Sequence, residues 1–138
     1  MTSGPVAVVE RLQAAINARD LEALLSCFDP EVTSTQPAHP ARNFTGSAQV
    51  RQNWAQIFAG VPDISAELLR YAAQDDTVWA EWAWTGTRRD GNRFEMRGVT
   101  IQAVGQSDIK RVTFYMEPLE TAGPAVSASV GQAVGGRQ

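Results

Sequence analysis

The chain has 138 residues, of which 43% are hydrophobic and 20% are charged, a balance typical of one soluble globular domain. The formal net charge is −3, and the sequence has no basic stripe of the kind that displaces counterions from nucleic acid. The single cysteine, Cys27, excludes an internal disulfide and, without a zinc-type Cys/His cluster, favours a reducing cytoplasm. No apolar run reaches the length of a membrane span. We therefore expect a cytoplasmic protein that binds neither nucleic acid nor a membrane.

The first half of the chain predicts three helices. Apolar residues recur at helical spacing over residues 5–17, after a proline that suits a first helical turn. Asp20 is a good N-cap for a second helix in "NARDLEALLSCF", which "DPEV" ends. The segment "TSTQPAHPARNFTG" has no helical period and is interpreted as extended chain and loop. A third helix is expected over residues 47–59, because Gly60 and Pro62 follow it.

From Ile64 the hydrophobic period changes to two, which predicts four antiparallel strands. They are "ISAELLRYAA", "TVWAEWAWTGTRR", "RFEMRGVTIQAV" and "IKRVTFYMEPLE", and Asp90-Gly91 is a good turn signal between the second and the third. The order of elements predicts an α+β domain over residues 1–120, with three N-terminal helices on one face of a curved, four-stranded, mostly antiparallel sheet. Residues 121–138 form a low-complexity C-terminal tail, expected to be disordered or to need a partner surface.

Several short segments in this order resemble one known group of proteins. The helix with "AAINARDLEALLSCFDPEV", the proline-rich loop, "FTG" before a helix, "GVPDI" and a strand meander ending in "YMEP" resemble the SnoaL-like group. This group belongs to the nuclear transport factor 2-like superfamily, with ketosteroid isomerase and limonene epoxide hydrolase as relatives. The resemblance covers about residues 5–120. It implies a cone-shaped fold with a deep apolar pocket, frequent dimerisation, and polycyclic or terpenoid substrates in several members.

The catalytic groups of the ketosteroid isomerases are missing at the corresponding positions. Their tyrosine on the first helix corresponds to Leu12, their base before a proline corresponds to Gln36, and their protonated aspartate corresponds to Thr100. An amide accepts no proton near neutral pH, so Gln36 cannot replace the base. The resemblance therefore does not extend to steroid isomerisation.

The triad of the epoxide hydrolases is missing as well. Its arginine and aspartate in the second strand correspond to Glu81 and Ala83, and its aspartate in the last strand corresponds to Phe114. The chain thus resembles both enzyme types in fold without carrying either set of catalytic groups.

Two interpretations compete for the second strand, because alternation puts Trp79, Glu81 and Ala83 on one face and Trp82 and Trp84 on the other. Hydrophobicity alone would bury the two tryptophans, whereas the resemblance implies that the Glu81 face lines the pocket. We adopt the second interpretation. The substrate-binding residues expected on this basis, Glu81 aside, are Gln36, Leu12, Trp54, Phe58, Trp79, Ala83, Phe94, Met96, Thr100, Phe114 and Met116.

Glu81 and His39 are the candidate catalytic residues. Burial in an apolar pocket raises the pKa of a carboxyl group, which makes it usable as an acid or base. The alternatives are a solvated Glu81, or one paired with an arginine, and a His39 that is an ordinary loop residue. No metal or cofactor is expected. The pattern favours a small cofactor-free enzyme that isomerises, cyclises or hydrolyses a hydrophobic polyketide- or terpenoid-like molecule. The alternative is a non-catalytic module that binds a lipophilic small molecule.

Adopting the Glu81 face as the pocket wall leaves two tryptophans to be covered on the outer face of the sheet. A homodimer would cover them, since exposed apolar patches of this size mark interaction sites. The expected interface contains Trp82, Trp84, Arg97, Tyr115 and Glu117.

Overall fold

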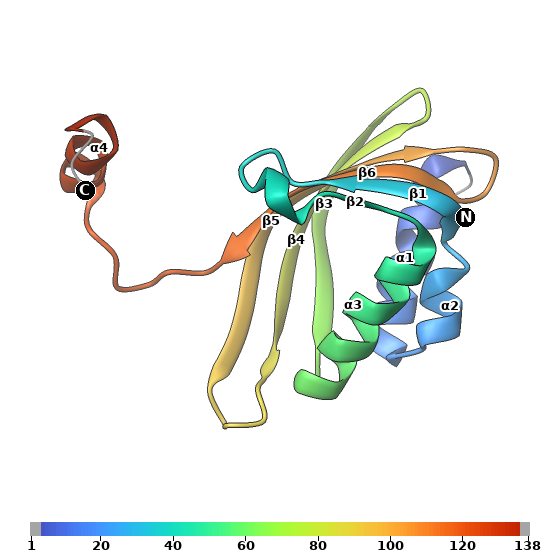
Figure 1. Ribbon diagram of the computed structural model, residues 1–138, viewed down its shortest axis with the longest axis horizontal. Coiled ribbons are helices and arrows are strands. Elements are labelled where there is room, and N and C mark those ends of the chain that lie inside the picture. The colour runs from blue at the N-terminus through green and yellow to red at the C-terminus, as the bar shows by residue number, and fades with distance from the viewer. Residues whose placement is uncertain (1–3, 136–138) are drawn as a thin grey trace.

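The computed structural model describes residues 4–135 and places three helices on one face of a curved, unclosed sheet of six strands (Figure 1). The helices are α1 (Pro5–Ala18), α2 (Leu21–Leu25), α3 (Ser47–Gly60) and α4 (Val126–Gly135), and η1 (Pro40–Arg42) is a short 3₁₀ turn. The strands are β1 (Phe28–Thr35), β2 (Phe44–Thr45), β3 (Ser65–Gln74), β4 (Thr77–Thr87), β5 (Arg93–Val104) and β6 (Ile109–Pro118). The α+β class with helices packed on a curved sheet is confirmed.

The three N-terminal helices begin and end close to the residues that the sequence predicts. Pro5 occupies the first turn of α1, and Arg19 closes that helix in the left-handed conformation, with φ of 52°. The Asp20 side chain accepts a hydrogen bond from the backbone N–H of Ala23 at 3.0 Å and so caps α2. Helix α2 is shorter than expected, because Phe28 already belongs to β1.

The sheet has the strand order β2-β1-β6-β5-β4-β3. The predicted meander corresponds to β3 to β6, and its three pairings are antiparallel. The predicted count of four strands is too low, because β1 and β2 lie in the segment interpreted as loop. Strand β1 pairs in parallel with β6, and a shift of register between Phe28 and Thr33 interrupts that pairing. This irregular strand begins with "FDP" and shows no clean alternation, so its sequence gives a weak strand signal.

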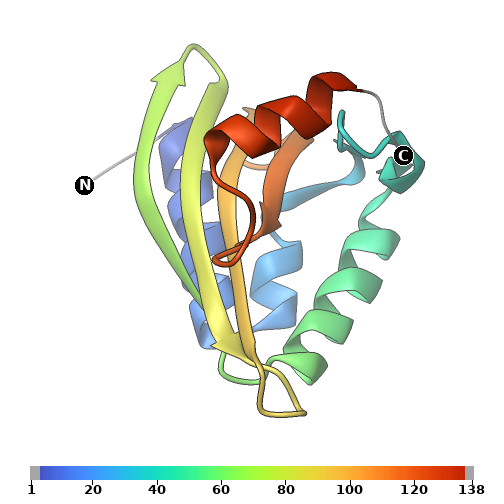
Figure 2. The ribbon, with the colours of Figure 1, turned by 90° about the vertical axis from the view of Figure 1, so that its left-hand side faces the viewer.

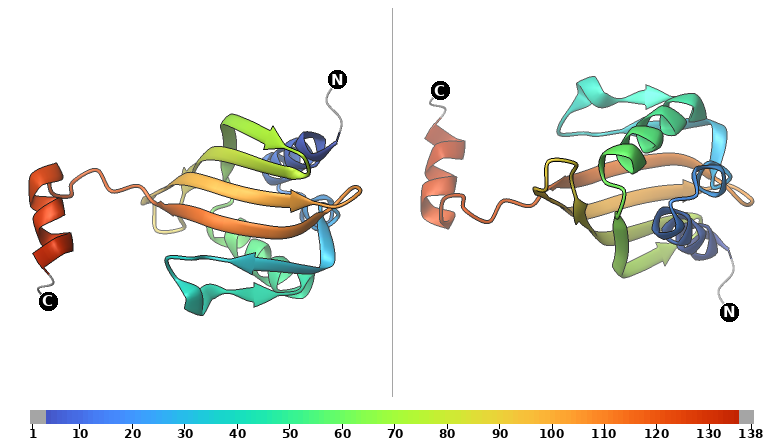
Figure 3. Two further views of the ribbon diagram at one scale, coloured as in Figure 1. Left: turned by 90° about the horizontal axis from the view of Figure 1, so that it is seen from above. Right: turned by 90° about the horizontal axis from the view of Figure 1, so that it is seen from below.

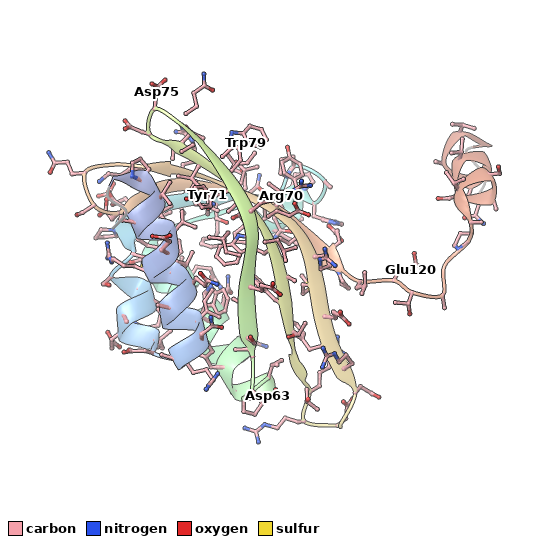
Figure 4. The ribbon with its side chains drawn as sticks, turned by 180° about the vertical axis from the view of Figure 1, so that it is seen from behind. Asp63, Arg70, Tyr71, Asp75, Trp79 and Glu120 are labelled. Carbon is pink, nitrogen blue, oxygen red and sulfur yellow. The ribbon has the colours of Figure 1, made fainter. Side chains whose placement is uncertain are left out.

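The side chains of β4 point in the opposite directions to those that the resemblance implies. Val78, Ala80, Trp82 and Trp84 point toward the helices, and Trp82 and Trp84 are only 1% and 7% exposed. Trp79 in the other row is 51% exposed, and Glu81 is bonded to Arg70 on the outside of the sheet. Figure 4 shows Arg70 and Trp79 on the neighbouring strands β3 and β4. The physical reason is hydrophobic burial, since two indoles inside the core remove far more apolar surface from water than Ala83 and Glu81 would.

Within residues 121–135 the low-complexity tail contains α4, which follows a connection after β6. None of the residues of α4 is buried. Figures 1 and 3 show α4 standing away from the sheet and the other helices. None of the helices in the described residues combines the length and the apolar character that a membrane span needs.

Candidate functional site

A cavity of about 980 Å³ lies between the concave face of the sheet and α3. Figure 2 looks onto the side of the molecule where the sheet, α3 and the η1 loop face one another. Most of the wall is apolar, and its apolar side chains are Phe28, Phe44, Val50, Trp54, Ile57, Val61, Trp84, Phe94, Met96, Val112, Phe114 and Met116. The volume lies in the range of small-molecule pockets in proteins, and the lining is mainly apolar.

Tryptophans form the inner part of this wall. The ring of Trp54 on α3 packs edge-on against Trp84 on β4, with 5.4 Å between centroids, and Trp84 lies 6.2 Å from Trp82. The indole N–H of Trp84 is buried and has no hydrogen-bond acceptor among the described residues. This N–H is also closed off from solvent, so it is a buried donor whose hydrogen bond is not satisfied by the described residues.

Four uncharged polar side chains line the cavity: Ser34, Gln36, Asn53 and Gln56. The Gln36 backbone N–H donates to Asn43 Oδ1 at 2.8 Å, and the side-chain Oε1 of Gln36 accepts from Arg42 at 3.2 Å. Asn53 Oδ1 accepts from Gln49 at 2.8 Å. None of these groups exchanges a proton near neutral pH, so they can orient a ligand but cannot act as acid or base.

Five charged residues also line the cavity: Arg42, Arg88, Arg89, Asp90 and Glu117. Glu117 is part of the wall at the end of β6, and its Oε2 lies 2.9 Å from His39 Nε2, so the two form a hydrogen-bonded pair. On β6, Glu117 belongs to the outward row, opposite Arg97 on β5, and His39 itself is not among the residues that line the cavity.

At the β4–β5 turn the rim carries Arg88, Arg89 and Asp90. Hydrogen bonds from the backbone N–H and then the side chain of Asn92 hold the pKa of Asp90 below its usual range. Asp90 is therefore ionised at neutral pH.

A second, much smaller chamber of about 20 Å³ lies deeper in the cone, where Leu12 and Thr100 contribute to the wall. Thr100 Oγ1 accepts from Trp82 Nε1 at 2.8 Å and from Gln102 Nε2 at 2.7 Å. A space of this size holds one water molecule at most. Because its hydroxyl already has two buried partners, Thr100 does not polarise a substrate in the large cavity.

The structure places six of the expected pocket residues in the wall of the large cavity: Gln36, Trp54, Phe94, Met96, Phe114 and Met116. Leu12 and Thr100 lie in the small chamber, and Phe58 stacks on Trp54 at 5.6 Å without lining either space. Trp79, Glu81 and Ala83 lie in the outward row of β4.

The expectation that Glu81 is a carboxylate inside the pocket is wrong. Its side chain lies outside the cavity and forms an ion pair with Arg70 of the neighbouring strand. The other interpretation of the β4 pattern, in which hydrophobicity alone buries the tryptophans, would have found Trp84. Glu117 could not be found in the same way, because it is 78 residues from His39 in the chain.

The described residues contain no group of three or more histidine, cysteine, aspartate or glutamate side chains that could hold a metal ion. Cys27 is buried, and its burial raises the pKa of the thiol above its usual value. It is therefore a packed core residue that does not present a thiolate.

A comparison of the sequence with protein families matches residues 9–112 to the SnoaL-like domain. The chain belongs to the SnoaL-like family. No curated protein matches it. The family assignment confirms the resemblance seen in the helices, the proline-rich loop and the strand meander.

Solved structures share the fold at low sequence identity. IdmH of Streptomyces antibioticus, a candidate polyketide cyclase, matches with a TM-score of 0.72 and 20% identity over 83% of this chain and 93% of that chain. AclR of Streptomyces galilaeus, a candidate hydroxylase, has a TM-score of 0.70 and 16% identity over 83% and 88% of the two chains. A ketosteroid isomerase-like protein of Catenulispora acidiphila, in complex with trimethylamine, has a TM-score of 0.69 and 19% identity over 82% and 87%. At these identities the likeness concerns the fold alone.

Proposed function

We propose that this SnoaL-like protein is a cofactor-free enzyme that performs acid/base chemistry on a hydrophobic polyketide- or terpenoid-like molecule held in the large cavity. The reaction classes are isomerisation, cyclisation or hydrolysis, because each of them needs proton transfer without a redox group. The observation that carries the proposal is Glu117, which lines an apolar cavity of about 980 Å³ and is hydrogen-bonded to His39 at 2.9 Å.

The titratable groups of the lining support chemistry at Glu117. Glu117 lines the cavity and is hydrogen-bonded to His39, whereas the uncharged polar residues of the wall offer only hydroxyl and amide groups. A substrate would bury its apolar body against Trp54, Trp84 and Phe114 and leave its reacting carbon at the opening. Binding energy from the remote apolar part then orients the reacting part.

A carboxylate hydrogen-bonded to an imidazole is a suitable pair for moving a proton. The carboxylate fixes the orientation of the ring, and the second ring nitrogen of His39 is left to exchange a proton with substrate or water. Rate enhancements from one placed proton-transfer group are typically about 10²–10⁴-fold, which is enough for an activated carbon acid.

The second candidate is a binding module without chemistry. It is favoured by one observation: among the described residues that line the cavity, the only carboxylates are Asp90 and Glu117, and both lie at the rim. A ligand held entirely in the deeper part would meet no titratable group.

A solvent-isotope experiment separates the two candidates. The small-molecule extract of the source organism is incubated with the protein in D₂O, and mass spectrometry follows compounds that gain carbon-bound deuterium or change retention time. Catalysis predicts at least one such compound, whereas binding alone predicts none.

Matched variants identify the groups that transfer the proton. His39→Ala and Glu117→Gln should each lower the conversion by about 10²-fold or more. Glu81→Gln makes the same chemical change on the outer face, where Glu81 pairs with Arg70, and should leave the conversion unchanged. Loss of conversion in Glu81→Gln together with full conversion in His39→Ala would refute the proposed pair.

A further inference from the structure

The polar groups of the cavity wall offer mainly hydrogen-bond donors, because protein groups already occupy most of the acceptors. Gln36 Oε1 is bonded by Arg42, and a guanidinium has no acceptor, so the amide oxygen of Gln36 must face Arg42. The Gln36 NH₂ group is thereby left to donate to a ligand. The hydrogen bond that the Gln36 backbone N–H donates to Asn43 Oδ1 fixes the loop that carries Gln36 and Arg42.

Asn53 on α3 follows the same rule. Asn53 Oδ1 accepts from Gln49 at 2.8 Å, which leaves its NH₂ group as a donor on the α3 side of the cavity. Amide donors from a loop and a helix thus line one apolar space, and they match a ligand that carries oxygen acceptors.

The arginines that line the cavity add a second requirement for the ligand. Arg42, Arg88 and Arg89 line the cavity, and none of them forms an ion pair within 4.0 Å among residues 4–135. Arg88 lies near Asp90, whose pKa it helps to lower, and Arg89 donates to the carbonyl of Ala59 at 2.7 Å. Arg42 has only the neutral amide of Gln36 as its side-chain partner. A guanidinium next to an apolar cavity with no carboxylate of its own is suited to bind a carboxylate from the ligand.

We infer that the ligand is a hydrophobic carboxylic acid whose carboxylate binds Arg42 and the Gln36 amide, while its apolar body packs against the aromatic wall. The inference rests on the proposed use of the cavity as the substrate site, and it narrows the substrate to an anion. Loss of the charge, by esterification for example, should weaken binding even though the apolar body is unchanged.

The test compares two probes with the same ring system, 1-pyrenebutyrate and its methyl ester, by fluorescence titration of the full chain at low ionic strength. The acid should bind about tenfold or more tightly than the ester, as expected for a charge-assisted hydrogen bond, and added salt should reduce the difference. Arg42→Met should abolish the preference for the acid. Arg70→Met removes the same charge from the outer face, where Arg70 pairs with Glu81, and should retain the preference.

Three outcomes would overturn the inference. If acid and ester bind equally to the wild-type protein, the cavity takes a neutral ligand, and the proposed function stands without the anion. If the acid is preferred but Arg42→Met keeps the preference, the anion binds elsewhere. If neither probe binds, while circular dichroism shows a folded protein, the cavity is not a site for hydrophobic ligands, and both this inference and the proposed function fail.

Discussion

The indoles of Trp82 and Trp84 are neighbours in one row of β4, yet their N–H groups differ. Trp82 donates to Thr100 at 2.8 Å, whereas the Trp84 N–H is buried without a protein acceptor. Changing either residue to phenylalanine removes the same atoms. We expect Trp82→Phe to lower the free energy of unfolding by about 1 kcal/mol more than Trp84→Phe, because only the first change breaks a hydrogen bond. Urea denaturation of the ligand-free variants measures this difference, and equal losses would contradict it.

The same two residues show how much of the site could be predicted at this scale. The period-two hydrophobic pattern of "TVWAEWAWTGT" alone predicts that Trp82 and Trp84 are buried, as they are in the structure. The prediction of the β4 facing was wrong only because the resemblance to a distant family was given more weight than this pattern. The contacts of Gln36 with Arg42 and of His39 with Glu117 could not be predicted in this way. They depend on how the η1 loop folds and on which strand end it meets, and neither follows from local pattern.

At the scale of the elements, an ion pair between Asp29 and Lys110 joins strands β1 and β6. Asp29 accepts from Lys110 at 2.7 Å, and this hydrogen bond, with one from the Glu31 backbone N–H, holds the pKa of Asp29 below its usual value. Since the folded pKa is lowered, the contact stabilises the protein fully above the ordinary aspartate pKa of about 3.9. Its contribution is lost as the pH falls through the lowered value.

The prediction for this junction concerns stability at two pH values. Asp29→Asn should be less stable than the wild-type protein at pH 7 and should equal it at a pH below the lowered pKa of Asp29. Thermal denaturation at the two pH values measures both differences. A loss of stability of the same size at both values would show that the charge of Asp29 is not responsible.

The C-terminal helix α4 does not pack against the rest of the fold. The side chains of Val126, Val130 and Val134 are exposed, and no residue of α4 is buried. We therefore expect a chain ending at residue 120 to have the same midpoint of thermal unfolding as the full chain. A clear fall in that midpoint would place the domain boundary beyond residue 120 and would show that the tail contacts the domain.

The elements differed in how well their sequences predicted them. The long helices and the β3–β6 meander were predictable because caps, turns and hydrophobic period agree along each of them. Strands β1 and β2 were not, because they are short or irregular and are held by pairing with a strand far along the chain.

At the scale of the whole molecule, the outward face of the sheet carries an apolar strip formed by Trp79, Val99, Ile101 and Tyr115. Trp79 pairs with Ile101 across β4 and β5, and Val99 pairs with Tyr115 across β5 and β6. We expect a homodimer through this strip, with Arg97 and Glu117 beside it. The expectation that Trp82 and Trp84 lie in the interface is wrong, since both are inside the protomer.

Analytical ultracentrifugation at micromolar concentration tests the dimer. Trp79→Asp should convert it to a monomer, whereas Tyr71→Asp, an exposed aromatic of β3 in the row paired with Ala80, should leave it intact. A monomeric wild-type protein would rule out the strip as an interface.

The claim on which the account depends is that the large cavity holds a hydrophobic small molecule. Native mass spectrometry of the protein isolated from its own source organism tests this claim most directly. The account predicts a bound compound, one per chain, that is lost in Ile57→Trp, where a larger ring on α3 fills the space, and retained in Arg70→Met on the outer face. The absence of any bound compound from the wild-type protein, or its retention in a folded Ile57→Trp variant, would contradict the claim.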